Sequence, residues 1–89
     1  MINEELYTQT LATVREIISA ETGNEMEEIL PDMHLEDELE VAEGDLTRLI
    51  KVLNGHFNIQ LDPAAIEEEE SVTTVRELAT VVAEEIELG

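Results

Sequence analysis

Apolar residues recur at helical spacing in the first segment of the chain. They are Tyr7, Leu11, Val14 and Ile18, with Ile17 widening the stripe. Because positions three or four residues apart share one face of a helix, residues 3–20 are predicted to form a helix with one buried side. Asn3 can cap its start, and Gly23 is typical of the left-handed residue that ends a helix.

A second helix is predicted over residues 44–54. Its apolar stripe consists of Leu46, Leu49, Ile50 and Leu53. Gly55 follows as a natural stop. Asp62 and Pro63 then have the order of a cap and a first helical residue, which predicts a short third helix.

The last helix is predicted to begin at Thr73 or Thr74. Thr74 and Glu77 have the spacing of a capping box, in which each side chain accepts from the other residue's backbone N–H. The inward face of this helix is expected to consist of Val75, Leu78, Val81, Val82 and Ile86.

Two connections also carry apolar residues. Those of the longer one, residues 24–42, are Ile29, Leu30, Met33, Leu35 and Leu39. We expect this loop to pack on the helices, with one helical turn near residues 25–29. Residues 57–61 are predicted to form an extended connector. The side chains expected to be largely buried are Tyr7, Leu11, Val14, Ile18, Leu46, Leu49, Ile50, Leu53, Phe57, Ile59, Leu61, Leu78, Val81 and Val82.

The composition is strongly acidic. The 89 residues include 23 acidic side chains against four cations, and the formal net charge is −19. Nucleic acid phosphates repel such a surface, so we expect no nucleic acid binding, whereas a basic protein partner is favoured. There is no cysteine, no signal-like N-terminus and no apolar run of the ~20 residues that a membrane span needs. These features predict a single domain, residues 1–89, that is cytoplasmic, monomeric and not membrane-bound.

Four stretches, in this order, resemble the acyl carrier protein family. Residues 23–32 (GNEMEEILPD) resemble the turn after that family's first helix, and residues 35–39 (LEDEL) resemble the approach to its modified serine. Residues 57–62 (FNIQLD) resemble the connector before its third helix, and residues 71–78 (SVTTVREL) the opening of its last helix. The resemblance implies an all-α four-helix bundle with three long helices, one short helix and a long loop between the first two.

The resemblance places Glu43 where the family has a serine loaded with 4′-phosphopantetheine. The family has Asp-Ser-Leu where this chain has Ala42, Glu43 and Gly44, and the alignment over residues 39–57 needs no gap. A carboxylate has no hydroxyl to attack coenzyme A. We therefore expect neither phosphopantetheine nor any other cofactor on this chain.

Other hydroxyl groups are poor substitutes for the missing serine. Ser19 falls near the end of the first predicted helix, Ser71 precedes the last, and Thr47 lies one turn inside the second. Glu43 itself has two explanations. Its charge can simply favour the positive end of a helix, by about 0.3–1 kcal/mol, or it can keep a negative charge where the phosphodiester would lie.

The second predicted helix also differs from the family in its surface charge. Family members usually show acidic residues there, whereas this chain adds Arg48 and Lys51 to Glu43 and Asp45. The two cations can pair with Glu40, Glu43 or Asp45, which contributes little to stability, or they can dock a partner. These observations make Glu43, Asp45, Arg48 and Lys51 the candidate partner-binding residues.

No catalytic or metal site is predicted. His34 and His56 are far apart, and residues 32–38 lack the ligand pattern of a calcium loop. The favoured hypothesis is a non-enzymatic interaction module of the acyl carrier type, bound by a carrier-recognising enzyme or a relative of one. One alternative is a genuine carrier of a fatty-acid, polyketide or nonribosomal-peptide pathway with a variant attachment site, which would then hold 4′-phosphopantetheine. Another is an acidic adaptor or inhibitor that occupies a basic site on its partner.

Overall fold

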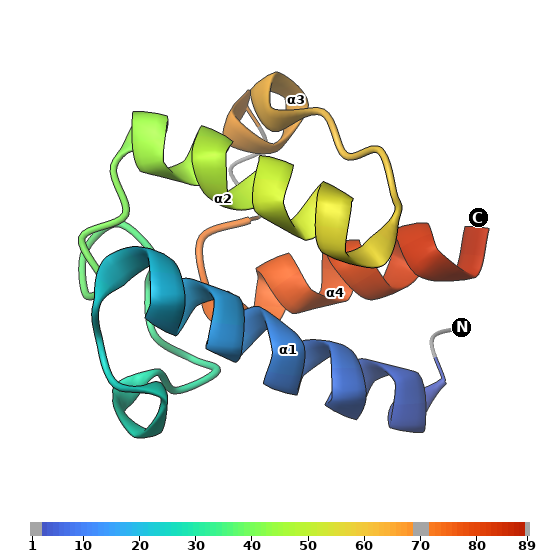
Figure 1. Cartoon of the computed structure of the whole chain (residues 1–89), viewed down its shortest axis with the longest axis horizontal. Helices are drawn as coiled ribbons and strands as arrows, with labels where there is room; N and C mark the ends of the chain where they lie inside the picture. The colour runs from blue at the N-terminus through green and yellow to red at the C-terminus, as the bar shows by residue number, and fades with distance from the viewer. Residues whose placement is uncertain (1–2, 69–71, 89) are drawn as a thin grey trace.

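The computed structural model describes residues 3–68 and 72–88, except for the side chain of Glu43. Within these residues the helical elements are α1 (Glu4–Thr22), the 3-10 turn η1 (Met26–Glu28), α2 (Glu43–Phe57), α3 (Pro63–Glu68) and α4 (Val75–Leu88). Helices α1 and α4 lie side by side in opposite directions, and α2 contacts both α1 and α3 (Figure 1). The predicted all-α architecture, with three long helices, one short helix and a long first loop, is confirmed.

The predicted caps are present at both ends of α1. The Oδ1 atom of Asn3 accepts hydrogen bonds from the backbone N–H groups of Glu5 (2.8 Å) and Leu6 (3.4 Å). At the other end, Gly23 adopts the left-handed conformation with φ of 81°. The helix extends to Thr22, slightly beyond the predicted end, because the cap residue that stops it is Gly23 itself.

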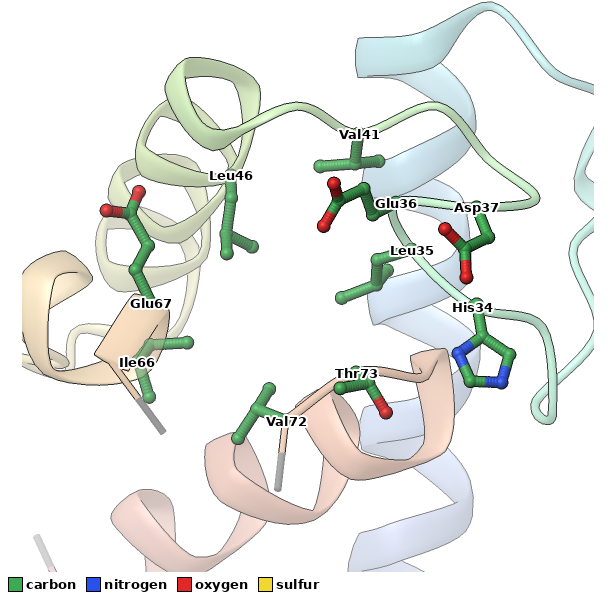
Figure 2. A pocket seen from close by; sticks show the side chains of 10 residues that line it. All are labelled: His34, Leu35, Glu36, Asp37, Val41, Leu46, Ile66, Glu67, Val72 and Thr73. Atoms are coloured by element: carbon green, nitrogen blue, oxygen red, sulfur yellow. The ribbon is translucent and has the colours of Figure 1, made fainter. Parts of the chain in front are cut away.

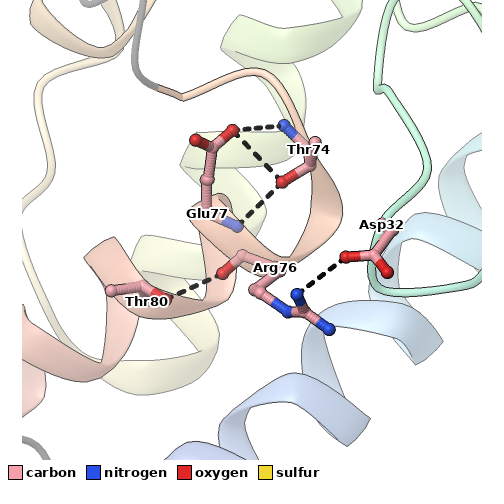
Figure 3. A network of polar contacts seen from close by, with 5 residues as sticks. All are labelled: Asp32, Thr74, Arg76, Glu77 and Thr80. Atoms are coloured by element: carbon pink, nitrogen blue, oxygen red, sulfur yellow. Dashed lines mark hydrogen bonds and ion pairs between the residues drawn. The ribbon is translucent and has the colours of Figure 1, made fainter.

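Helices α3 and α4 also begin at the predicted caps. Asp62 Oδ1 accepts from the N–H of Ala64 at 3.0 Å, at the start of α3. Glu77 N–H donates to Thr74 Oγ1 (3.2 Å), and Glu77 Oε1 accepts from the N–H of Thr74 (3.0 Å), which completes the capping box of α4 (Figure 3). The same Oε1 atom accepts from the N–H and the hydroxyl of Thr73, both at 2.9 Å. These donors, the Thr73 N–H foremost, lower the pKa of Glu77.

The end of α2 differs from the prediction. The helix continues through Gly55 to Phe57, and Asn58 ends it in the left-handed conformation with φ of 56°. Phe57 lies four residues after the buried Leu53, so one more turn of helix brings its ring against the core. Asparagine accepts the left-handed conformation more readily than most residues. The predicted stop at Gly55 is therefore wrong, and Phe57 belongs to the helix rather than to the connector.

The stripes of α1, α2 and α4 supply the centre of the core. The expected residues that are fully buried are Val14, Ile18, Leu49, Ile50, Leu53, Leu78 and Val82. The other expected residues are only partly buried and surround this cluster: Tyr7, Leu11, Leu46, Phe57, Ile59, Leu61 and Val81. A chain this short has too few residues to cover every apolar side chain. Ala79 and Ala83, which were not expected in the core, are completely buried on α4.

The loop over residues 24–42 packs on the helices, as predicted. Ile29, Leu35 and Leu39 are buried, and η1 supplies the expected helical turn. Met33 is partly buried against the core. Leu30 departs from the expectation, because 55% of its surface is exposed.

Polar contacts that the sequence did not predict fix this loop at two places. Arg15 of α1 donates from Nε to the carbonyl of Ile29 (2.7 Å) and from Nη2 to the carbonyl of Met26 (2.9 Å). Further along, the Leu35 N–H donates to the carbonyl of Thr73 at 2.9 Å, beside an isolated antiparallel bridge between the loop and the residues before α4. The loop therefore joins both terminal helices before it reaches α2.

Candidate functional site

The candidate attachment position lies at the start of α2. Ala42 precedes the helix and Glu43 is its first residue, followed by Gly44 and Asp45. Asp45 Oδ2 accepts from the Ala42 N–H at 3.4 Å, but alanine has no side-chain oxygen to accept in return. The helix thus begins with only half of a capping box. The Glu43 side chain is outside the described part of the structure, so its expected role stays a prediction.

The turn before α2 is anchored on both sides. Leu39 and Val41 are 4% and 5% exposed, and the Val41 N–H donates to the carbonyl of Leu35 at 2.8 Å. Between them Glu40 adopts φ of 56°, a conformation that residues with a side chain rarely accept. Since both neighbours are held in the core, the chain turns at Glu40 and α2 starts at a defined point.

The four cations of the chain have two kinds of surroundings. Arg15 donates hydrogen bonds to carbonyls of the first loop. Arg76 of α4 forms an ion pair with Asp32 of that loop, with 2.8 Å between Nη1 and Oδ1 (Figure 3). Arg48 lies 4.0 Å from Asp45, and these side chains are 67% and 52% exposed. Lys51 is exposed, and no carboxylate of the described residues forms an ion pair with it. Among the described side chains, pairing therefore accounts for little of the positive charge on α2.

The described hydroxyl groups that were considered as substitutes for a serine lie away from the first turn of α2. Ser19 Oγ donates to the carbonyl of Asn24 at 2.6 Å, at the end of α1. Thr47 Oγ1 donates to Glu67 Oε1 of α3, also at 2.6 Å. Ser71 is outside the described residues.

A cavity of about 500 Å³, which the sequence did not predict, lies between the first loop, α2, α3 and the start of α4 (Figure 2). Its apolar lining consists of Leu35, Val41, Leu46, Ile66 and Val72. Its polar lining consists of His34, Glu36, Asp37, Glu67 and Thr73. Four separate segments contribute these residues, so no local sequence pattern could have indicated the cavity.

Two further kinds of site were sought in the described residues. They contain no group of three or more histidine, aspartate or glutamate side chains placed to hold a metal ion. None of their helices combines the length and the apolar character that crossing a membrane requires.

A sequence profile of one domain family matches most of the chain. That family is described as the phosphopantetheine attachment site, and the match covers residues 12–82. The matched range contains all of α2 and α3 and parts of α1 and α4. No curated protein gives a significant match. Together with the all-helical bundle, the profile shows that the chain belongs to the phosphopantetheine attachment site family, to which acyl carrier proteins belong.

Proposed function

We propose that this protein is a carrier-type interaction module that is not loaded with phosphopantetheine. The supporting observation is that α2 begins with a carboxylate residue, Glu43, at the position where the family resemblance expects the modified serine. Attack by a carboxylate on the pyrophosphate of coenzyme A would break the P–O–P bond, release adenosine 3′,5′-bisphosphate and give a mixed anhydride. Water cleaves such an anhydride, whereas the phosphodiester formed by a serine is stable. Residues 42–46 include no hydroxyl side chain. The protein would therefore bind its partner without carrying an acyl group.

The proposed partner is a protein that contacts α2 and the loop before it, such as a carrier-recognising enzyme or a relative of one. An enzyme adapted to an acidic carrier helix presents cations to it. Here Arg48 and Lys51 would face those cations, and like charges across an interface can cost several kcal/mol. We therefore propose that the partner places acidic groups opposite Arg48 and Lys51, and basic groups opposite Asp45 and Glu43.

Loading is tested by incubating the protein with coenzyme A and a promiscuous phosphopantetheinyl transferase, followed by intact-mass measurement. The expected result is no mass gain, with an ordinary carrier domain as the positive control. Glu43→Ser and Glu43→Ser/Gly44→Leu test whether restoring the family's residues restores loading. A phosphopantetheine mass mapped to any residue of the unaltered chain would establish the alternative of a genuine carrier.

The docking surface is tested with a charge-matched pair of variants. Arg48→Gln/Lys51→Gln removes two cations from α2, whereas Gln9→Glu/Gln60→Glu adds two anions at exposed positions elsewhere. Both changes make the chain more negative by the same amount. Partners that co-purify with the unaltered protein should bind the second variant and lose affinity for the first. Equal binding to both variants would remove this face of α2 from consideration.

The alternative of an acidic adaptor predicts a different dependence on salt. Binding that relies on total charge weakens steeply as ionic strength rises, since exposed charges are screened. Such binding would also be strengthened, and not merely retained, by Gln9→Glu/Gln60→Glu. Partner affinity measured between low and high salt on the two variants therefore separates the adaptor from the interaction module.

A further inference from the structure

The longest stretch of the sequence without a carboxylate forms most of α2 and the connector after it. Acidic residues occupy 23 of the 89 positions, yet none occurs in residues 46–61. The same stretch contains two of the four lysine and arginine residues, Arg48 and Lys51, and one of the two histidines, His56. All three lie in α2 and are exposed. The outer face of α2 is therefore basic along its own length, on a molecule whose net charge is −19.

The exposed residues of α2 form two neighbouring rows along the helix. Arg48, Val52 and His56 follow one another at intervals of four residues, and Lys51 and Gly55 form the second row with the same interval. Rows with this interval are the commonest contact surface between two helices. Val52 is 36% exposed, and the aliphatic stems of the two long cations extend the apolar surface beside it. This face therefore combines an apolar centre with cationic sides.

Little of this face is neutralised or covered by the described residues. Arg48 has its nearest ion pair with Asp45, at 4.0 Å between Nη1 and Oδ1, and both side chains are more than half exposed. Such a pair contributes little. No described carboxylate forms an ion pair with Lys51. Gly55 has open space where a Cβ would stand, so the backbone of a second helix can approach it closely.

We propose that the outer face of α2, from Arg48 to His56, docks an amphipathic helix that carries carboxylates around an apolar residue. The proposal rests on the α2 docking surface proposed above and adds the form of the partner. The carboxylates pair with Arg48 and Lys51, and the apolar residue covers Val52 beside Gly55. A nucleic acid fits this face less well, because its many phosphates are repelled by the net charge of −19.

The overall charge gives this docking a distinctive dependence on salt. The molecule as a whole repels an acidic helix over about 30 Å at 0.01 M salt but over only about 10 Å at 0.1 M. The contacts with Arg48 and Lys51 act at about 4 Å and are screened much less. The affinity for an acidic helix should therefore rise at least about threefold between these two salt concentrations. An affinity that falls over this range would contradict the proposal.

The first test uses alanine-based helical peptides of about 20 residues with a central leucine. The positions three and four residues to either side of the leucine carry glutamate, glutamine or lysine. In NMR titrations of the labelled protein, the glutamate peptide should shift the backbone amides of Arg48, Lys51, Val52, Gly55 and His56 in a saturable manner. The glutamine peptide should bind roughly tenfold more weakly there. The lysine peptide should shift amides elsewhere, since the rest of the surface is acidic.

Two outcomes of this titration would overturn the proposal. One is a glutamine peptide that binds α2 as tightly as the glutamate peptide, because the cations would then have no role. The other is a shift of the same α2 amides when the protein alone is diluted, because a second copy of the chain would then cover this face.

The second test places the same side chain on two exposed helix faces. Gly55→Gln and Ala12→Gln alter α2 and α1 respectively. Glutamine favours a helix more than glycine does, so Gly55→Gln should unfold at the same temperature as the unaltered protein or a higher one. It should nevertheless lose roughly tenfold in affinity for the glutamate peptide, because its side chain fills the space beside Val52. Ala12→Gln should bind within about twofold of the unaltered protein. Equal affinities of the two variants would show that the peptide lies elsewhere.

The docking surface and the acidic helix can fail separately. If the glutamate peptide does not bind, but partners that co-purify with the protein lose affinity for Arg48→Gln/Lys51→Gln, the docking surface stands and the acidic helix is wrong. If those partners bind that variant normally, the docking surface is wrong, and the acidic helix with it.

Discussion

One carboxylate oxygen of Glu77, in the first turn of α4, binds two consecutive residues that precede the helix, Thr73 and Thr74. That oxygen accepts from the backbone and the hydroxyl of both Thr73 and Thr74, while the Glu77 N–H donates back to Thr74. Donors of this kind favour the ionised form, which lowers the pKa of the carboxyl group. The ionised side chain therefore stabilises the start of α4, and with it the segment that pairs with the first loop.

The stabilising effect of Glu77 should depend on pH. A carboxyl group whose pKa is lower in the folded state stabilises the fold above its ordinary pKa of about 4.3, and this contribution is lost as the pH falls through the folded value. Glu77→Gln should lower the free energy of unfolding at pH 7 by less than about 1 kcal/mol, since the site is partly exposed. The difference from the unaltered protein should shrink toward pH 3 in urea unfolding. Glu84→Gln on the same helix is the control for lost charge, and a pH-independent gap for Glu77→Gln would contradict the prediction.

Arg15 and Arg48 offer a second comparison between single residues. Both carry one positive charge, but only Arg15 binds two loop carbonyls, at 2.7 Å and 2.9 Å. Arg15→Gln should reduce the free energy of unfolding by about 1–3 kcal/mol, because carbonyls in a packed loop lose their donor. Arg48→Gln should change it by less than about 1 kcal/mol. If chemical denaturation gave similar losses in the free energy of unfolding for the two variants, the lost charge would be responsible. The hydrogen bonds from Arg15 to the loop would then contribute little.

Two glycines near the C-terminal ends of helices have different roles: Gly23 ends α1, whereas Gly55 lies inside α2. Gly55 lies inside the helix with open space where a Cβ would be, whereas Gly23 ends α1 with φ of 81°. Glycine within a helix is unfavourable relative to alanine, whereas alanine in the left-handed conformation is strained.

Replacing each of these glycines by alanine should therefore have opposite effects. Gly55→Ala should raise the free energy of unfolding by about 0.5–1 kcal/mol, and Gly23→Ala should lower it by about 1 kcal/mol or more. The midpoint of thermal unfolding, read from the helical circular dichroism signal, checks both. Had α2 ended at Gly55 as the sequence suggested, both substitutions would destabilise the protein.

The features that could be predicted from the sequence are those fixed by residues close together in the chain. Features that depend on contacts between distant residues were missed. The predicted caps at Asn3, Asp62 and Thr74 are confirmed. Each was predicted from residue types that lie within about four residues of the helix start. The end of α2 was missed because Phe57 extends the helix by packing on distant residues. The cavity and the hydrogen bonds from Arg15 to the first loop were missed for the same reason. Both form only when the loop is packed on the helices. The Glu43 hypothesis came from family resemblance and not from a local signal.

On the scale of the whole molecule, charge repulsion extends across the entire fold. The molecule measures 30 × 27 × 22 Å and carries a net charge of −19. The screening length is about 30 Å at 0.01 M salt and about 10 Å at 0.1 M. At low salt each carboxylate therefore repels those on the far side, whereas at higher salt it repels only its neighbours.

Salt should consequently stabilise this protein. The unfolding temperature should rise between 0.01 M and 0.5 M sodium chloride, with most of the gain below about 0.1 M. Magnesium chloride at equal ionic strength should give a similar rise, because the ions act by screening the carboxylates. A much larger rise with magnesium in differential scanning calorimetry would reveal a specific cation site.

The two terminal helices also determine how the fold would respond to mechanical tension. Asn3, before α1, donates its N–H to Glu87 Oε1 near the end of α4 at 3.2 Å, and the helices run antiparallel from there (Figure 1). A force that pulls the two ends apart would act across the helix pair rather than along it. The α1–α4 contact would then peel open from this end one turn at a time, instead of sliding as a unit. The domain should therefore yield to a small force applied at its ends, even though the same contact holds well when the chain is at rest.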